Sequence, residues 1–220
     1  MKLFGIFKKI KKVVILDFDG TFYTGENIFD KIPAYIKRHK REFFPRISDA
    51  DYERILKENP EFKNIYHGSD VVGSMFLFKR KYPELDISAK DFWDFQNSKP
   101  DPLVLENAAI VNAELMCKVC KKYPVYIVSN SSPTHVKFYL QKFGIEPEWF
   151  SEIISNKFTV KDKSKKHYYR NILQKEKVDP SQIVVMGDNF KNDIEPALEL
   201  GMNAFKIESV CQFEKLLKKL

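Results

Sequence analysis

The sequence lacks any long apolar run. No stretch of the 220 residues approaches the ~18 consecutive apolar residues that a membrane-spanning helix needs. Glycine and proline are not enriched, with 8 and 11 residues, and no low-complexity tract or internal repeat is present. These absences argue against collagen-like, solenoid and largely disordered chains. With 44% hydrophobic residues, the chain is long enough for a full core.

Cysteine is also scarce. Three residues, an odd number, argue against a disulfide framework and for a reducing compartment. Cys117 and Cys120 form a CxxC inside an expected helix, without a second ligand pair, which indicates reduced thiols rather than a metal site. The start, MKLFGIFKKIKK, is too short and too interrupted by lysine to be a secretory signal. We therefore expect a soluble, cytoplasmic protein.

The charge is positive, with a net value of +7 and a pI near 9.1. A basic surface attracts partners that carry phosphate, although a solvated lysine-rich surface is the commoner cause of such a charge. No zinc-finger spacing or RNA-binding aromatic signature is present, so no specific nucleic-acid partner is expected. Residues 1–12 place Leu3, Phe7 and Ile10 on one face, which suits either a membrane surface or, as the favoured interpretation, packing against the core. Nothing indicates the oligomeric state.

Four short β-rich runs are present, at 13–16, 125–128, 183–186 and 203–207. The first three are apolar on both faces, as is typical of parallel strands covered by helices. Segments with helical periodicity follow them; one contains Pro133 in its expected first turn and Gly144 as its stop signal. Strands that alternate with helices predict an α/β fold with a doubly wound, Rossmann-like, mostly parallel sheet.

The interval between the first two of these strands has no β-run of this kind but several helix-like stretches. It is too long for an ordinary connection and predicts an inserted α-helical cap domain over residues 23–102. Residues 1–22 and 103–220 then form the α/β core. A long helix over residues 102–122 is expected to return the chain to the sheet.

Polar side chains follow three of the apolar runs. Asp17 and Asp19 follow the first, Ser129 and Asn130 the second, and the segment GDNFKND, with Asp188 and Asp193, the third. Ligands of open α/β sheets bind beyond the carboxyl ends of the strands, so these groups are expected to share one crevice. Ser129 also precedes a helix start, where amide groups favour an anion. Carboxylates brought together repel unless a hard cation such as Mg²⁺ lies between them.

These segments resemble the four motifs of the haloacid dehalogenase-like (HAD) hydrolase superfamily. LDFDGT at 16–21, IVSN at 127–130, a lysine in KDKSKKHYY at 161–169 and MGDNFKND at 186–193 occur in that family's order. The resemblance implies that Asp17 is a nucleophile that forms an aspartyl-phosphate, and that Asp19 is the general acid and base. It implies that Mg²⁺ is held by Asp17, Asp188 and the backbone carbonyl of Asp19.

The resemblance also implies the phosphate contacts. Ser129 and an amide near Asn130 would hold phosphate oxygens, and Thr21 is a further expected substrate contact. An acid at position 19 favours phosphoryl transfer over dehalogenation, because a halide leaves without a proton.

The phosphate-site lysine has four candidates, Lys161, Lys163, Lys165 and Lys166. The family's usual spacing to the GD motif selects Lys163, with the other three solvated. Asp193 would lie in the metal's outer shell or orient Lys163.

His67, in a glycine-containing turn of the insertion, is the candidate specificity residue, with a solvated surface histidine as the commoner alternative. The predicted function is Mg²⁺-dependent hydrolysis of a small phosphorylated metabolite, with nucleotide or sugar phosphates favoured. The alternatives are a phosphomutase of the same superfamily and a non-catalytic module that binds a phosphorylated ligand.

Overall fold

The computed structural model describes residues 12–24, 48–58, 83, 105, 108–131, 133–155 and 165–220. The chain divides into two compact units, one formed by residues 1–24 and 109–220 and the other by residues 25–108. In the second unit, the structure describes helix α3 (Asp49–Glu58), whose first turn is capped by the Ser48 hydroxyl accepting from the Asp51 amide at 3.1 Å. The helical-cap character of the insertion stays a prediction.

The first unit is built on a five-stranded parallel sheet with the strand order β5-β4-β1-β6-β7. Its strands are β1 (Val13–Leu16), β4 (Val125–Ser129), β5 (Glu152–Ser155), β6 (Ile183–Gly187) and β7 (Asn203–Lys206). The expected α/β, Rossmann-like parallel sheet is thereby confirmed. β5 was not predicted, because EIIS is a short segment whose residues are exposed or only half-buried.

Strand β1 lies at the centre and pairs with β4 on one side and β6 on the other. All four of its residues are fully buried, which explains its continuous apolar sequence. The chain crosses from β1 to β4 in one direction and reaches β6 in the other, so the strand order reverses at β1. This reversal is the place where ligands bind in doubly wound sheets.

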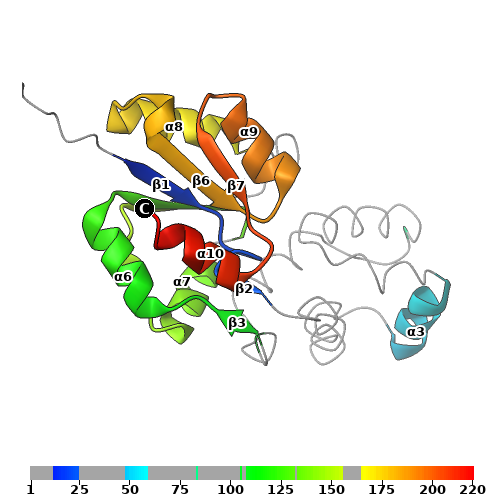
Figure 1. Cartoon of the computed structure of the whole chain (residues 1–220). Coiled ribbons are helices and arrows are strands. Elements are labelled where there is room, and N and C mark those ends of the chain that lie inside the picture. The colour runs from blue at the N-terminus through cyan, green and yellow to red at the C-terminus, as the bar shows by residue number, and fades with distance from the viewer. Residues whose placement is uncertain are drawn as a thin grey trace, which may run out of the picture. The chain divides into compact units, whose positions relative to one another are not determined.

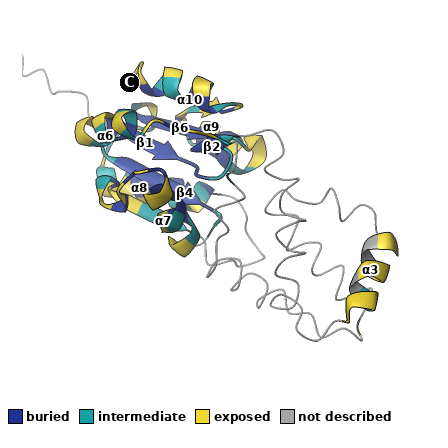
Figure 2. Cartoon of the chain, turned by 90° about the horizontal axis from the view of Figure 1, so that it is seen from below, coloured by how far each residue is buried: buried dark blue, intermediate teal, exposed yellow. Residues whose placement is uncertain are grey.

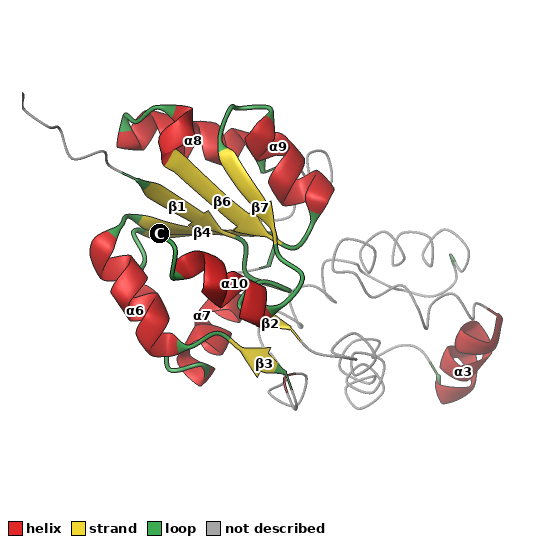
Figure 3. Cartoon of the chain, in the orientation of Figure 1, coloured by secondary structure: helices red, strands yellow, loops and turns green. Residues whose placement is uncertain are grey.

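Helices cover both faces of the sheet, as Figures 1 and 3 show. One face carries α8 (Lys166–Glu176) and α9 (Glu195–Leu198), and the other carries α6 (Ala113–Lys122), α7 (Pro133–Lys142) and α10 (Val210–Leu217). Val13 and Ile15 pack in one cluster with Tyr169 and Ile172 of α8, whereas the alternate residues of β1 point to the opposite face. Figure 2 shows the central strands in the buried colour and the surrounding helices with exposed and half-buried residues.

Short helical turns complete the unit: η3 (Pro147–Trp149), η4 (Pro180–Gln182) and the π-helical turn η5 (Phe190–Ile194), which runs into α9. Pro133 begins α7 as expected, and Gly144 follows its end with a positive φ of 69°. None of the helices in the described part of the chain combines the length and apolar character that crossing a membrane requires.

A two-stranded antiparallel ribbon flanks the insertion. It joins β2 (Tyr23–Thr24) to β3 (Ala109–Ile110), with Tyr23 opposite Ile110. The helix predicted over 102–122 is therefore wrong at residues 108–112. Residues 109–110 pair with a strand far away in the sequence, and α6 begins only after Asn112, whose side chain accepts from the Leu115 amide at 2.9 Å.

Cys117 and Cys120 lie half-buried on α6 as free thiols, in agreement with the sequence interpretation. Burial, followed by the neighbouring Cys117, raises the pKa of Cys120 to about 12. A thiol of this kind is unreactive at neutral pH.

Candidate active site

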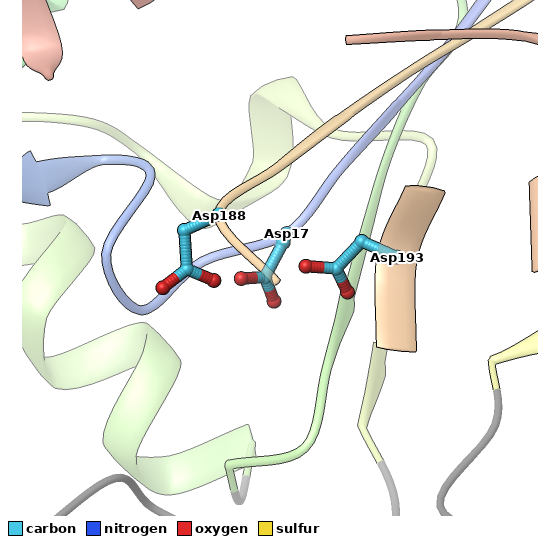
Figure 4. Close-up of side chains that lie close together, drawn as sticks. All are labelled: Asp17, Asp188 and Asp193. Atoms are coloured by element: carbon cyan, nitrogen blue, oxygen red, sulfur yellow. The ribbon is translucent and has the colours of Figure 1, made fainter. Parts of the chain in front are cut away.

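The carboxyl ends of the three central strands bring the sequence motifs together. Asp17 follows β1, Asp188 follows β6, and Asp193 lies on the π-helical turn η5. A carboxylate oxygen of each lies within 4.8 Å of one from each of the others. Figure 4 shows the three side chains in a row with Asp17 in the middle. Hard oxygen donors at this separation form a group that could hold a divalent cation such as Mg²⁺.

Lys165 is the cation of this cluster. Its Nζ lies 2.5 Å from Asp17 Oδ1 and 2.7 Å from Asp193 Oδ1, and its side chain is only 2% exposed. Burial by itself would lower the pKa of Lys165, but Asp17 and Asp193 outweigh it and hold the pKa above the usual value. The lysine therefore stays charged and offsets part of the negative charge around Asp17.

The three carboxylates still repel one another despite the positive charge of Lys165. Burial raises the pKa of Asp17; Lys165 opposes the shift, and Asp193 and Asp188 add to it. Burial, with the Asp193 carboxylate as the second cause, raises the pKa of Asp188 to about 6. Protons and a divalent cation would therefore compete for these carboxylate oxygens.

Two glycines let the backbone approach these carboxylates. A Cβ at Gly20 would lie 2.4 Å from Asp188 Oδ2, and Gly20 has a positive φ of 75°. A Cβ at Gly187 would lie 2.5 Å from Asp193 Oδ2. Asp193 Oδ2 also accepts from the amide of Asn189 at 2.9 Å, so this carboxylate is anchored to the loop that carries Asp188. The glycines of DFDGT and MGD are therefore required by close packing.

Asp19 has different surroundings. Its Oδ1 accepts from the Tyr23 hydroxyl at 2.5 Å and lies 3.0 Å from His135 Nε2, while Oδ2 accepts from the Ser131 hydroxyl at 2.6 Å. The Ser129 hydroxyl is more distant, at 3.4 Å from Oδ2. Burial would raise the pKa of Asp19, but His135 and these hydrogen bonds outweigh it, and the pKa lies well below its usual range. Asp19 is thus a carboxylate at neutral pH.

The expected substrate contacts differ in where they lie. Ser129 was expected to follow the strand and is instead its last residue; it is buried, and its hydroxyl accepts from the Ser131 amide at 3.0 Å. Asn130 follows at the same sheet edge and is half-buried. Thr21 is fully buried, and its hydroxyl has no hydrogen-bond partner in the described part of the chain. His67 lies outside the described residues, so its role stays a prediction.

The assignment of the site lysine needs revision. Lys161 and Lys163 lie outside the described residues, whereas Lys165 was expected to be solvated and is buried against Asp17. Lys166 is partly exposed and pairs with Glu199 at 2.5 Å, away from the carboxylate cluster. The expectation for Lys165 was wrong because α8 begins at Lys166, which brings the residue just before the helix to the sheet edge.

Sequence reasoning missed Tyr23, Ser131 and His135. Tyr23 immediately follows the first motif, while Ser131 and His135 follow the second and reach Asp19 across more than 110 residues. The only available signal was a run of polar residues at the start of a predicted helix, directly after a strand that ends at the site. Such residues commonly cap helices, and so the signal was not specific.

The fold and the carboxylate–lysine cluster define a Rossmann-like α/β protein with an acidic site at its topological switch point. The family model of the haloacid dehalogenase-like hydrolases matches residues 11–201, most of the chain. The chain therefore belongs to the haloacid dehalogenase-like hydrolase family. No curated protein matches the sequence closely enough to serve as a relative.

Solved structures of this family resemble the chain over nearly its whole length. A HAD phosphatase from Thermococcus onnurineus has 18% identity and a TM-score of 0.56, over 94% of this chain and 97% of that one. A HAD-hydrolase from Bacillus subtilis, bound to magnesium, has 16% identity and a TM-score of 0.58, over 96% and 100%. A 2-haloacid dehalogenase from Pseudomonas syringae has 16% identity and a TM-score of 0.54, over 96% and 99%. Because both a phosphatase and a dehalogenase resemble the chain, the fold alone does not choose between their reactions.

Proposed function

We propose that this chain hydrolyses the phosphomonoester of a small metabolite through an aspartyl-phosphate on Asp17. The observation that carries the proposal is the difference between two carboxylates one residue apart. Asp17 is buried against a charged lysine, and Asp19 accepts hydrogen bonds from the hydroxyls of Tyr23 and Ser131. One group is suited to attack and the other to proton transfer. A reaction that expels a halide needs no such second carboxylate.

In the first step, a carboxylate oxygen of Asp17 attacks phosphorus, and the bond from phosphorus to the ester oxygen breaks. A proton from Asp19 passes to that leaving oxygen. A phosphate dianion beside Asp19 favours the protonated form that this step requires, because a neighbouring negative charge raises the pKa of a carboxyl group.

In the second step, water attacks the phosphorus of the aspartyl-phosphate, and Asp19 accepts the water's proton. The bond between phosphorus and Asp17 breaks, which restores the carboxylate and releases phosphate. Asp19 has given up its proton in the first step and is therefore a carboxylate that can accept one in the second. One residue thus serves as acid and then as base.

Mg²⁺ fits the residues present. Three carboxylates gather around one point, and Lys165 brings a single positive charge to them. Asp17 and Asp188 would hold the ion, with the Asp19 carbonyl as the further proposed ligand. Asp193 is already bonded to Lys165 and to the Asn189 amide, which supports a role in orienting the lysine. When bound, Mg²⁺ supplies positive charge that lets an anionic nucleophile approach an anionic phosphate. A structural relative that was solved bound to magnesium supports the choice of this ion.

Lys165, rather than Lys163, is the lysine that we place at the phosphate. Its position beside Asp17 lets it stabilise the negative charge of the phosphoryl group during both transfers. Ser129, Asn130 and Thr21 remain the proposed contacts of the substrate at this end of the sheet. The resemblance around DFDGT and the basic surface favour nucleotide or sugar phosphates as substrates.

The test is phosphate release by the full chain from a panel of nucleotide and sugar phosphates in the presence of Mg²⁺. We expect turnover that EDTA and Asp17→Asn abolish, and an acid-quenched peptide in which Asp17 carries a phosphoryl group. Asp179→Asn is the matched control, because Asp179 is exposed and caps the distant η4 turn; it should keep full activity.

Other outcomes identify other functions. Isomerised sugar phosphate formed only with a bisphosphate activator would establish a mutase. Halide release from 2-haloacids without phosphatase activity would establish a dehalogenase. A ligand-dependent thermal shift without turnover of any kind would establish a binding module, and each of these results overturns the proposal.

A further inference from the structure

Two side chains outside the four motifs converge on one oxygen of Asp19. The Tyr23 hydroxyl lies 2.5 Å and His135 Nε2 lies 3.0 Å from Asp19 Oδ1. We propose, on the basis of the proposed function, that Tyr23 and His135 are positioning residues that hold the Asp19 carboxylate in the orientation needed for proton transfer. They come from β2 and α7, so the acid is clamped between two separate elements of the core.

Asp19 needs such a clamp. It follows β1 in a loop rather than a regular strand, next to Gly20 with its positive φ, and its side chain is 37% exposed. A carboxylate in this setting can rotate about its side-chain bonds. Proton transfer to a leaving oxygen requires hydrogen-bond geometry, and a displacement of about 1 Å can reduce a rate about 100-fold.

Tyr23 is itself held rigidly. It lies in the β2–β3 ribbon and is almost fully buried. Its ring contacts those of Phe18, Tyr139 and Phe143 at centroid distances of 5.8, 6.0 and 5.8 Å. The hydroxyl at the end of this fixed ring donates to Asp19, so the position of the ring determines where Oδ1 lies.

His135 is held in place on α7, the second of the two elements that contact Asp19. It lies in the first turn of α7, and its ring packs edge-on to those of Tyr139 and Phe18 at 4.7 and 6.3 Å. An ionised carboxylate only accepts hydrogen bonds, so Nε2 must carry the hydrogen in this contact. The same Phe18 and Tyr139 rings thus hold both donors, and they couple the orientation of Asp19 to the aromatic core.

The experiment compares rates across phosphomonoesters whose leaving groups range from p-nitrophenol to simple alkyl alcohols. The variants are Tyr23→Phe and His135→Leu, which remove the donors, and His135→Gln, which restores one. The double variants Asp19→Asn/Tyr23→Phe and Asp19→Asn/His135→Leu are measured alongside. A misplaced acid slows the loss of an alkyl alcohol, which needs a proton, much more than the loss of p-nitrophenol, which does not.

We expect Tyr23→Phe and His135→Leu each to lower the rate of phosphoryl transfer to Asp17, measured in a single turnover, about tenfold for alkyl phosphates and little for p-nitrophenyl phosphate. Hydrolysis of the aspartyl-phosphate, which is common to all substrates, should slow equally for both. His135→Gln should recover most of the loss. In the Asp19→Asn background, neither substitution should lower kcat further. A purely structural role predicts equal losses for all substrates and a further loss in that background.

The matched controls are Tyr126→Phe and His167→Leu. Tyr126 is buried at the other end of β4 and donates to Glu176, and His167 is exposed on α8. Both should match the wild type at every leaving group. Wild-type turnover with unchanged leaving-group dependence in Tyr23→Phe and His135→Leu would overturn this inference alone. A wild-type chain that turns over no phosphomonoester would overturn the proposed function and this inference together.

Discussion

Asp17 and Asp19 are separated by one residue and lie in opposite surroundings. Asp17 is buried among charges, with Lys165 on one oxygen and two other carboxylates nearby. Asp19 is partly exposed and accepts from hydroxyl groups and an imidazole. The pKa of the first is raised and that of the second is lowered. A single extended segment thus delivers two chemically different carboxylates, because each side chain points to a different part of the core.

The sharpest way to test this difference is to neutralise each carboxylate in turn. Asp17→Asn should reduce phosphate release below detection, since no other described side chain is placed to form the covalent intermediate. Asp19→Asn should lower kcat for an alkyl phosphate by about 10²–10⁴-fold. With p-nitrophenyl phosphate, the same variant should accumulate phosphorylated protein, because only the second proton transfer is then slow. Rapid-quench mass spectrometry of the intact protein measures both. Equal behaviour of the two variants with p-nitrophenyl phosphate would contradict the division of roles.

The charged surroundings of Asp17 depend on Lys165. Lys165→Met should lower the free energy of unfolding by about 3–5 kcal/mol, because it leaves Asp17 and Asp193 buried without their cation. Lys166→Met is the matched control, since its ion pair with Glu199 is partly exposed and worth at most about 1 kcal/mol. Urea denaturation of metal-free protein measures both values. Similar losses in the free energy of unfolding for the two variants would show that the buried ion pair contributes no more to stability than the exposed one.

The close approach of the loops to the carboxylates provides a third test. Gly20→Ala and Gly187→Ala should each destabilise the protein by about 1–3 kcal/mol, because the added methyl group overlaps a carboxylate of Asp188 or Asp193. Both should also weaken Mg²⁺ binding. Gly144→Ala is the control: Gly144 has a positive φ like that of Gly20 but open space around its Cβ position, so the variant should lose stability without loss of Mg²⁺ affinity. Thermal unfolding and calorimetric titration distinguish the two effects.

The smallest expected effect concerns pH. The pKa of Asp188 is raised to about 6 from an ordinary value of 3.8, so the folded metal-free protein binds more protons than the unfolded chain between these values. Its stability should therefore fall as pH rises through about 6. Mg²⁺ displaces the proton, and its affinity should decrease by up to about tenfold per pH unit below 6. Melting temperatures at pH 5, 6 and 7.5, with and without Mg²⁺, test this. A stabilisation by Mg²⁺ that is equal at all three values would contradict it.

Asp188→Asn isolates the carboxylate responsible. Without metal at pH 7.5, the variant should be at least as stable as the wild type, since a repelling charge is gone. It should lose most of the stabilisation by Mg²⁺. Retention of the full Mg²⁺ effect would show that Asp188 is not a ligand.

The sheet was predictable because β1, β4 and β6 are buried on both sides and therefore apolar throughout. This pattern is local, so a short window of sequence contains it. β5 is only half-buried, and β3 exists because it pairs with β2 more than eighty residues away in the sequence. Neither leaves a local signal, and the helix predicted across residues 109–112 failed for that reason.

The site was predictable to the extent that its residues follow strands. Asp17, Asp19 and Asp188 each come directly after a buried run, and strand geometry places them together. Lys165 is different, since it lies in a lysine-rich segment in which four residues have equivalent neighbours. Lys165 is buried because the tertiary structure places the first residue of α8, directly after it, at the edge of the sheet. Tyr23 and His135 are recognisable only from the distances to Asp19, which no sequence pattern contains.

The ribbon of β2 and β3 has a consequence for how the chain tolerates change. Residues 25–108 leave and return through two paired strands, so to the core the whole insertion is topologically one hairpin loop. Thr24 and Ala109, where the insertion leaves and rejoins the core, lie opposite each other in this ribbon. A change in the length of the insertion leaves this register intact, and the register keeps Tyr23, and through it Asp19, in place.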